Sequence, residues 1–239
     1  MKLEYTIPES KKDISLKKYL RIIELYKIAE KNETDVDERH IVSVCLGIPI
    51  KMVERIPFEE YQEVIEGVKQ SLASESVLHL TFELKGVKYG FINDLENMTA
   101  GEYAHLDQLL KDADKNAYRI LNVLYRPIIK EKKYKAWFSN KVDRKYLIEP
   151  YNKDRDVVVF EDAPYEMYES ALVFFYNLSK QLVNATLKFM KEDQQQQMIE
   201  QLGLVANGGG IKHLIPMLQQ SESELRKFTM NQSIKYSLD

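Results

Sequence analysis

The segment from Pro164 to about Gln197 constrains the fold more than any other part of the chain. Its apolar residues recur at spacings of three and four, which is the pattern of a buried helical face. They are Leu172, Phe175, Leu178, Leu182, Ala185 and Phe189. Other apolar residues widen this stripe beyond what one neighbouring element would cover: Val173, Phe174, Tyr176, Val183, Leu187 and Met190. We expect one long helix over residues 164–197, packed from several sides by its own domain or by another chain.

Size and charge limit the class of protein. The chain has 239 residues, of which 44% are hydrophobic and 30% charged, as in a soluble globular protein with a substantial core. The net charge of −3 provides no global basic field for a phosphate backbone, so nucleic acid is disfavoured as a partner. The densest apolar run, ALVFF, is far shorter than the roughly 20 residues of a membrane span. We therefore expect no membrane partner, and synthesis in the cytoplasm because the N-terminus lacks the apolar run of a signal peptide.

Helical periodicity dominates residues 14–73. Ser15 is placed as an N-cap of a first helix, and a second helix over residues 35–46 should end at Gly47. Pro57 precedes the amphipathic run FEEYQEVIEGVKQSL, where a first-turn proline belongs. These patterns predict an N-terminal helical region over residues 1–75.

The period then changes from helical to alternating. Residues 77–84 and 87–92 alternate around a Lys85-Gly86 turn, which predicts a β-hairpin with one apolar face. Thr99 and Glu102 have the spacing of a capping box, starting a helix that runs through Leu110. A further helix is expected from about residue 115 to Arg126-Pro127. Short strands are expected at 133–138, 145–150 and 157–160.

These patterns predict a mainly α fold with a small β-hairpin or sheet, an α+β class built around a long central helix. The second region, residues 76–239, holds the hairpin and the long helix 164–197. With no linker rich in Pro, Gly or Ser between them, we expect it to form one compact unit with the first region.

No pattern of residues predicts a catalytic, metal or cofactor site. The histidines (His40, His79, His105 and His213) lack metal-ligand spacing, and there is no CxxC or HExxH. Cys45 lies in the apolar run IVSVCLGI, where a thiol packs as a small hydrophobe. The segment Lys130–Phe138 interleaves lysines with aromatic residues, which suits either a nucleic-acid patch or an exposed alternating strand.

Several motifs together resemble a known family. They are FINDLENMTAGEYAHLDQLL, NVLYRPI, YLIEPY and SALVFFYNLSKQLVNATLKFM, following the N-terminal ISLKKYLRIIEL and FEEYQEVIEGV. In this order they are similar to poorly characterised proteins of tailed bacteriophages of Bacteroidetes-type hosts, including crAss-like phages, encoded among virion structural and tail-assembly genes. The resemblance covers most of residues 14–190 and brings no catalytic residues with it. It implies a protein that is part of a phage particle or helps to assemble one.

The sequence thus leads to a non-enzymatic virion component, such as a tail, neck or packaged protein, that binds other phage structural proteins and forms a homo-oligomer or multi-copy assembly. Its location would be the virion, and the host cytoplasm during assembly. The alternatives are a cytoplasmic tail-assembly chaperone, an enzyme of unrecognised type and a single-strand nucleic-acid binder. The expected interface residues are Phe174, Tyr176 and Leu187, then Trp137 and Phe138, although each of the first three could instead fill the chain's own core.

Overall fold

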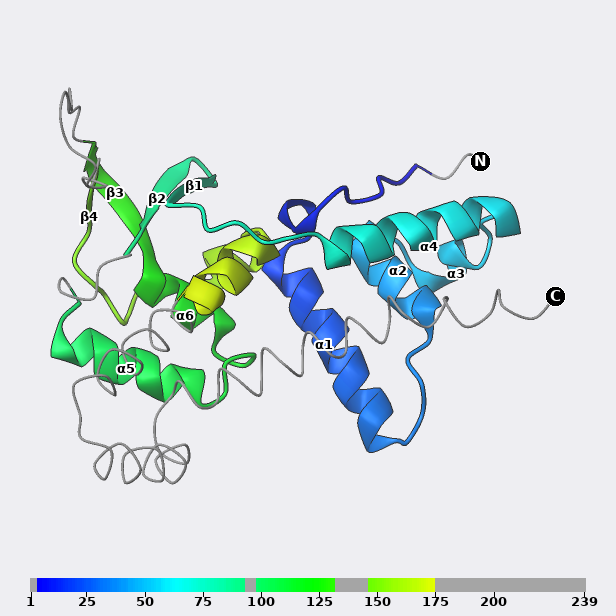
Figure 1. Ribbon diagram of the computed structural model, residues 1–239, viewed down its shortest axis with the longest axis horizontal. Helices are drawn as coiled ribbons and strands as arrows, with labels where there is room; N and C mark the ends of the chain where they lie inside the picture. Colours follow the sequence, from blue (N-terminus) through cyan, green and yellow to red (C-terminus); the bar gives the residue numbers. More distant parts are fainter. Residues whose placement is uncertain (1–3, 93–97, 132–145, 175–239) are drawn as a thin grey trace, which may run out of the picture. The chain divides into compact units, whose positions relative to one another are not determined.

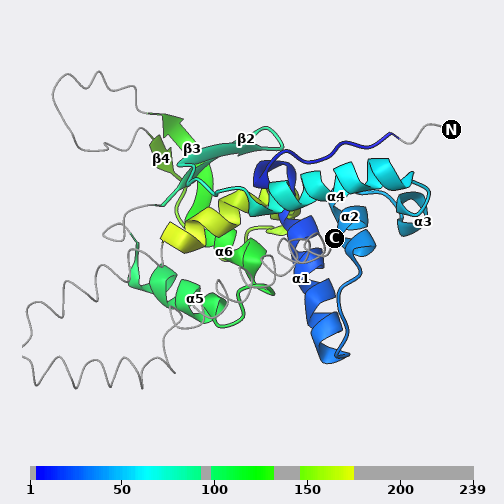
Figure 2. The same cartoon turned by 45° about the vertical axis from the view of Figure 1, so that its right-hand side comes forward.

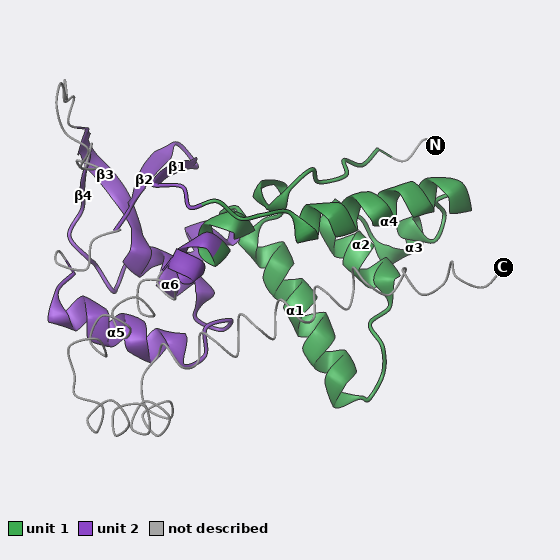
Figure 3. Ribbon diagram, in the orientation of Figure 1, with its two compact units in different colours: residues 1–77, 162–169, 215–239 green, residues 78–161, 170–214 purple. Residues whose placement is uncertain are grey.

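The computed structural model describes residues 4–92, 98–131 and 146–174. Over these residues the chain divides into two compact units (Figure 3). Unit 1 contains residues 4–77 and 162–169, and unit 2 contains residues 78–161 and 170–174. Unit 1 is therefore discontinuous in sequence, because the chain leaves it after Val77 and returns to it at Asp162.

Unit 1 is helical. It contains the short 3₁₀ helix η1 (Lys11–Asp13) and four α-helices: α1 (Leu16–Lys31), α2 (Glu38–Leu46), α3 (Ile50–Val53) and α4 (Phe58–Ala73) (Figure 1). Helix α2 contacts both α1 and α4. The apolar faces of these helices form the core of the unit, whose fully buried members include Leu16, Ile22, Ile41, Val68 and Leu72.

The ends of these helices follow the expected local chemistry. The Ser15 side chain accepts a hydrogen bond from the Lys18 amide at the start of α1, which confirms the predicted N-cap. Helix α2 ends at Gly47, whose φ of 72° is a left-handed conformation that favours glycine. Pro57 is the residue immediately before α4. It lacks the amide hydrogen that the first turn of a helix leaves unsatisfied.

Unit 2 contains an antiparallel sheet of four strands in the order β1-β2-β3-β4. The strands are β1 (Thr81–Leu84), β2 (Val87–Phe91), β3 (Tyr125–Glu131) and β4 (Tyr146–Ile148). The first two form the predicted hairpin, in which Phe82 pairs with Tyr89 and Leu84 with Val87. A β-bulge interrupts the pairing of β3 with β4 between Ile128 and Lys130.

Two helices accompany this sheet, α5 (Ala100–Leu110) and α6 (Ala117–Leu124); α5 contacts α6, and α6 leads directly into β3 (Figure 2). The predicted capping box at Thr99 and Glu102 starts α5. The core of the unit is aromatic. The Phe82 ring is stacked with Tyr89 at 5.4 Å between ring centroids, and both Phe82 and Phe91 contact Tyr125 at 5.0 Å.

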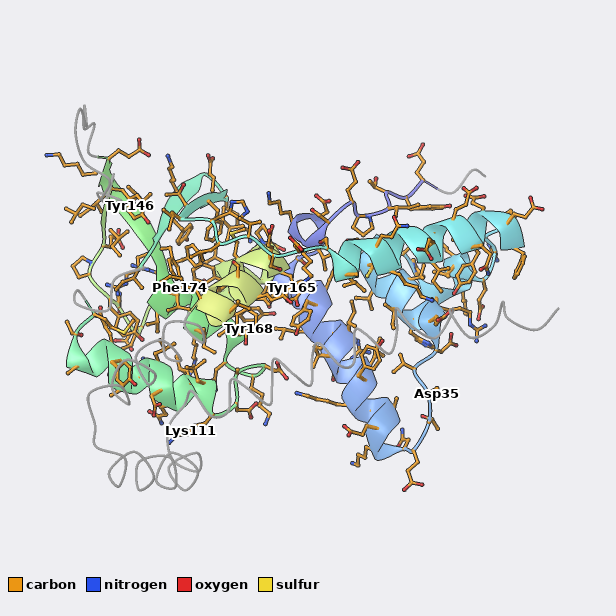
Figure 4. All side chains as sticks on the ribbon, viewed as in Figure 1. Asp35, Lys111, Tyr146, Tyr165, Tyr168 and Phe174 are labelled. Atoms are coloured by element: carbon orange, nitrogen blue, oxygen red, sulfur yellow. The ribbon has the colours of Figure 1, made fainter. Side chains whose placement is uncertain are left out.

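A helix begins at Tyr165 and continues to Phe174, the last described residue (Figure 4). Almost every side chain in its first two turns is buried, including Tyr165, Met167, Tyr168, Ala171 and Leu172, and the polar Glu166 and Ser170. Val173 is 39% exposed. Residues 165–174 of the predicted long helix are thus helical and mostly buried, while residues 175–197 lie outside the described residues.

The fold is a mixed α+β structure with a small antiparallel sheet, as the sequence predicted. Two local predictions were wrong. Residues 157–160 were expected to be a strand, but Val158–Asp162 form the 3₁₀ helix η3. The helix expected to reach Arg126 ends at Leu124, and the next residues form β3, which the sequence patterns did not reveal. The strand expected within residues 145–150 is β4, and the one at 133–138 lies outside the described residues.

Candidate functional site

A buried ion pair joins two of the most distinctive sequence motifs. Glu102, from the segment TAGEY, and Arg126, from LYRP, are each 5% exposed, and their Oε1 and Nη2 atoms are 2.9 Å apart. The second carboxylate oxygen of Glu102 accepts a hydrogen bond from the Thr99 amide at 2.6 Å. One side chain therefore caps helix α5 and neutralises the guanidinium that β3 carries.

A third motif, YLIEPY, meets the same pair through the backbone. The Glu149 amide donates to the Pro127 carbonyl at 2.9 Å, but Pro127 has no N–H to return this hydrogen bond. The Glu149 carbonyl is instead 3.4 Å from Nη1 of Arg126, which donates to it. Arg126 Nε donates to the Val123 carbonyl at 3.3 Å. The proline thus ends the β3–β4 ladder, and the neighbouring arginine satisfies the carbonyl left over.

The edge of this cluster carries a histidine and a tyrosine, both partly exposed. His105 Nδ1 is hydrogen-bonded to the Tyr151 hydroxyl, and the Tyr151 ring centroid is 5.7 Å from the Arg126 guanidinium carbon. Burial raises the pKa of Tyr151, although the positive charge of Arg126 opposes this shift. Tyr151 is therefore a neutral phenol at physiological pH.

A second arginine extends the network. Arg155 Nη1 donates to the Asn122 side-chain oxygen at 3.1 Å, and its Nη2 is 2.5 Å from the Glu149 carboxylate. Asn122, which is 2% exposed, donates in turn to the Asn152 carbonyl at 2.9 Å. This side of the cluster ties helix α6 to the segment that follows β4.

We name Glu102, Arg126, Tyr151, His105 and Glu149 the Glu102–Arg126 cluster. Titratable groups converge in it as they do in active sites, but Nε and Nη1 of Arg126 donate to backbone carbonyls of the chain itself, and Nη2 forms an ion pair with Glu102 that lacks hydrogen-bond geometry. Burial lowers the pKa of Arg126, and the Glu102 carboxylate partly offsets this effect. The arrangement suits the positioning of α5, α6, β3 and residues 149–151 relative to one another more than it suits binding of a substrate.

Unit 1 contains a smaller polar cluster around Glu169. Lys11 Nζ is 2.8 Å from one carboxylate oxygen, which also accepts from the Ser76 hydroxyl, and the Tyr165 hydroxyl donates to the other at 2.5 Å. The neighbouring Glu166 accepts a hydrogen bond from the Val77 amide at 2.9 Å. Through these contacts, the helix that begins at Tyr165 is joined to two other segments: the N-terminal segment at Lys11, and residues 76–77, which follow α4.

Cys45 and the described histidines do not converge on a site. Burial raises the pKa of the Cys45 thiol to about 12, so this thiol is not an activated nucleophile. His40 is 3.7 Å from Asp37 on the surface, and His105 belongs to the cluster above. Among residues 4–92, 98–131 and 146–174, no group of three or more His, Cys, Asp or Glu side chains could hold a metal ion. His213 lies outside these residues.

Of the five predicted interface residues, Phe174 is described. Its ring packs edge-on against Phe91, with 5.4 Å between centroids, and it is partly exposed. Part of the Phe174 side chain therefore packs in the core of unit 2. A role for Phe174 at an interface stays a prediction. Tyr176, Leu187, Trp137 and Phe138 lie outside the described residues, as does most of the Lys130–Phe138 segment. Lys130 itself is exposed on β3.

Three apolar side chains lie exposed at one end of the sheet. Val87, Ile129 and Leu147 are 41%, 55% and 49% exposed, on β2, β3 and β4. Continuing the pairing of Tyr89 with Pro127 by two residues places Val87 opposite Ile129. Ile128 pairs with Ile148, so alternation along β3 and β4 places their neighbours Ile129 and Leu147 together on the other face of the sheet. We name these three residues the apolar row.

Sequence patterns alone missed the Glu102–Arg126 cluster and the apolar row. The sequence patterns indicated a capping role for Glu102 and a helix stop at Arg126-Pro127, but no contact between them. A signal was present in LYRP, because a buried arginine beside a proline needs an acceptor for each nitrogen. The apolar row depends on strand β3, which residue spacing did not reveal.

Comparison of the sequence and structure with protein-family models, curated proteins and solved structures finds no match. No helix in the described part of the chain is long and apolar enough to cross a membrane.

Proposed function

We propose that this chain is a component of a tailed-bacteriophage particle, such as a tail, neck or packaged protein, and that it acts by binding other proteins of the particle. Sequence motifs similar to those of phage structural and tail-assembly proteins support this proposal. Three of these motifs supply the Glu102–Arg126 cluster, where they hold the fold of unit 2 together. These distinctive residues thus stabilise the fold of unit 2, a role that fits a protein that acts by binding other proteins.

The apolar row carries the proposal. Single exposed apolar residues are ordinary on a protein surface, but Val87, Ile129 and Leu147 lie on adjacent strands and are each more than two-fifths exposed. Such a row loses unfavourable contact with water when another protein covers it, which is the driving force of most protein association.

Mass spectrometry of purified particles, and of the assembly intermediates isolated with them, tests this function. We expect the chain in finished particles in a fixed ratio to the other structural proteins. Presence in intermediates with absence from finished particles would identify a tail-assembly chaperone instead. Absence from both would refute a role in the particle.

Two variants test whether the apolar row makes the contact. Ile129→Glu combined with Leu147→Glu should reduce incorporation into particles at least tenfold, because charge at the row would be buried without a partner. Val158→Glu is the matched control, since Val158 is similarly exposed at 58% but lies in η3 and belongs to none of the strands. Equal incorporation of both variants would show that the row is not the binding surface.

A further inference from the structure

Among the strands that the structure describes, β1 forms one edge of the sheet. It is the outermost strand in the order β1-β2-β3-β4, and the Phe91 amide donates to the Leu80 carbonyl at 2.9 Å. Because backbone groups alternate in direction along a strand, Leu80, Phe82 and Leu84 direct theirs toward β2. Thr81 and Glu83 direct theirs outward, and in the described part of the chain no hydrogen bond uses them.

The side chains beside this edge are incompletely covered. Leu80 is 37% exposed and Phe82 is partly exposed, although the Phe82 ring packs on Tyr89 and Tyr125. Both lie on the face of β1 whose partners in β2 are buried aromatic residues. The aromatic core of unit 2 therefore reaches the sheet edge, where Leu80 and Phe82 keep part of their surface exposed.

We propose that two copies of the chain pair through β1, antiparallel about a two-fold axis at Phe82, so that two four-stranded sheets become one continuous sheet. This inference rests on the proposed assembly function and names one of its contacts. In this register Thr81 of each copy faces Glu83 of the other, and their outward N–H and C=O groups exchange four hydrogen bonds. All outward groups of the edge are then satisfied.

The register also suits the side chains. Glu83 lies opposite the threonine of the second copy rather than opposite the same glutamate, so like charges do not oppose each other. The two Phe82 rings meet across the axis in the closely spaced, non-hydrogen-bonded type of pair. Leu80 of each copy lies opposite Leu84 of the other, which covers the exposed leucine. Self-complementarity of a single strand favours a second copy over an unrelated extended peptide.

A proline at position 83 provides a specific test. The Glu83 amide points away from β2, so Glu83→Pro removes a donor from the proposed contact and none from the β1–β2 ladder. Glu83→Thr is the matched control, since it removes the same charge and keeps the amide. Light scattering after gel filtration should give the wild type and Glu83→Thr about twice the mass of Glu83→Pro, which should keep the wild-type circular dichroism.

Equal masses for folded Glu83→Pro and wild type would overturn the proposal. Hydrogen exchange of the wild-type Thr81 and Glu83 amides tests it without a variant: both should become protected as protein concentration rises. Fast exchange of both amides at every concentration would overturn it as well. A chain that is monomeric in solution but present in particles refutes the β1 pairing and supports the proposed function. A chain that pairs through β1 but is absent from particles and intermediates supports the β1 pairing and refutes the proposed function.

Discussion

Arg126 donates hydrogen bonds through Nε and Nη1 and pairs through Nη2 with the Glu102 carboxylate, which is buried to the same extent. Arg126→Met should lower the free energy of unfolding by about 3–5 kcal/mol, because it leaves the Glu102 carboxylate buried without a counter-charge. Urea unfolding measures this loss. The double variant Arg126→Met with Glu102→Gln should recover much of it, since neither charge then remains.

Lys88→Met provides the control for charge removal itself. The Lys88–Glu131 ion pair in the same sheet has both side chains about half exposed, at 50% and 55%. Its loss should change the free energy of unfolding by less than about 1 kcal/mol. A cost for Arg126→Met that is as small as the cost for Lys88→Met would contradict an architectural role for the cluster.

Cys45 makes stability depend on pH in the alkaline range. Burial raises its pKa from 9.0 to about 12, so between these values the unfolded chain loses the thiol proton while the folded chain keeps it. The contribution of Cys45 to the free energy of unfolding is therefore fully present below pH 9 and falls as the pH rises from 9 toward 12. At pH 10 the loss should be about 1.4 kcal/mol.

Comparison with Cys45→Ala isolates this contribution, because other groups that titrate at high pH, such as Tyr165, are common to both proteins. Urea unfolding at pH 8 and pH 10 should give a wild type that loses about 1.4 kcal/mol more than the variant. Parallel losses in the two proteins would mean that Cys45 is accessible to solvent in the native state.

At the scale of elements, β2 contains a glycine that the sheet needs. A Cβ atom on Gly90 would lie 2.5 Å from Cε2 of Tyr146 and 2.8 Å from Cγ2 of Ile148, both on β4. Gly90→Ala should therefore lower the free energy of unfolding by roughly 1–3 kcal/mol, since the Tyr146 ring must move. That ring is anchored, because its hydroxyl contacts the Leu80 and Phe91 carbonyl oxygens at 2.9 and 3.0 Å.

Gly101→Ala is the matched control for Gly90→Ala. Gly101 lies in helix α5 and has nothing within 4 Å of its Cβ position, so alanine there should stabilise the protein by about 0.5–1 kcal/mol. Thermal unfolding of both variants should show shifts of opposite sign. A stabilising Gly90→Ala would mean that Tyr146 does not pack on β2.

Elements with local signals were predictable, and those set by distant contacts were not. The N-cap at Ser15, the capping box at Thr99 and the Lys85-Gly86 hairpin depend on neighbouring residues, and each was confirmed. Strand β3 was missed because Pro127 indicates a helix stop locally. Pro127 has no amide hydrogen, but the strand tolerates it because Pro127 lies where the β3–β4 ladder ends. The end of that ladder is set by pairing with Glu149, about 20 positions further along the chain.

The candidate site follows the same rule. Glu102 was predictable as a capping residue from Thr99, three positions before it, but its ion pair with Arg126 spans 24 positions and has no periodic pattern. Of the residues in the wide apolar face predicted for the segment from Pro164, Leu172 is buried as expected, whereas Val173 is 39% exposed and Phe174 partly exposed. The apolar pattern did not predict the polar contacts of Glu166 and Glu169 in that helix, because charged residues in an apolar stripe have many possible partners.

At the scale of the whole molecule, unit 1 is closed by two chain segments nearly 150 residues apart. The Leu16 amide donates to the Ala163 carbonyl and the Tyr165 amide to the Ile14 carbonyl, both at 2.8 Å. The Tyr19 and Tyr165 rings stack beside them, with 3.7 Å between centroids and 9° between planes. Hydrogen exchange at the Leu16 and Tyr165 amides therefore reports opening of unit 1.

Tyr19→Leu should weaken this closure without removing the apolar character of the site. We expect both amides to lose about tenfold protection, because the stacked ring area is lost from a side chain that is 3% exposed. The Ile92 amide, which donates to the Leu124 carbonyl at 2.8 Å within unit 2, is the internal control and should keep its protection. An equal loss at Ile92 would show that the two units open as one cooperative structure, since the damage in unit 1 would then be transmitted to unit 2.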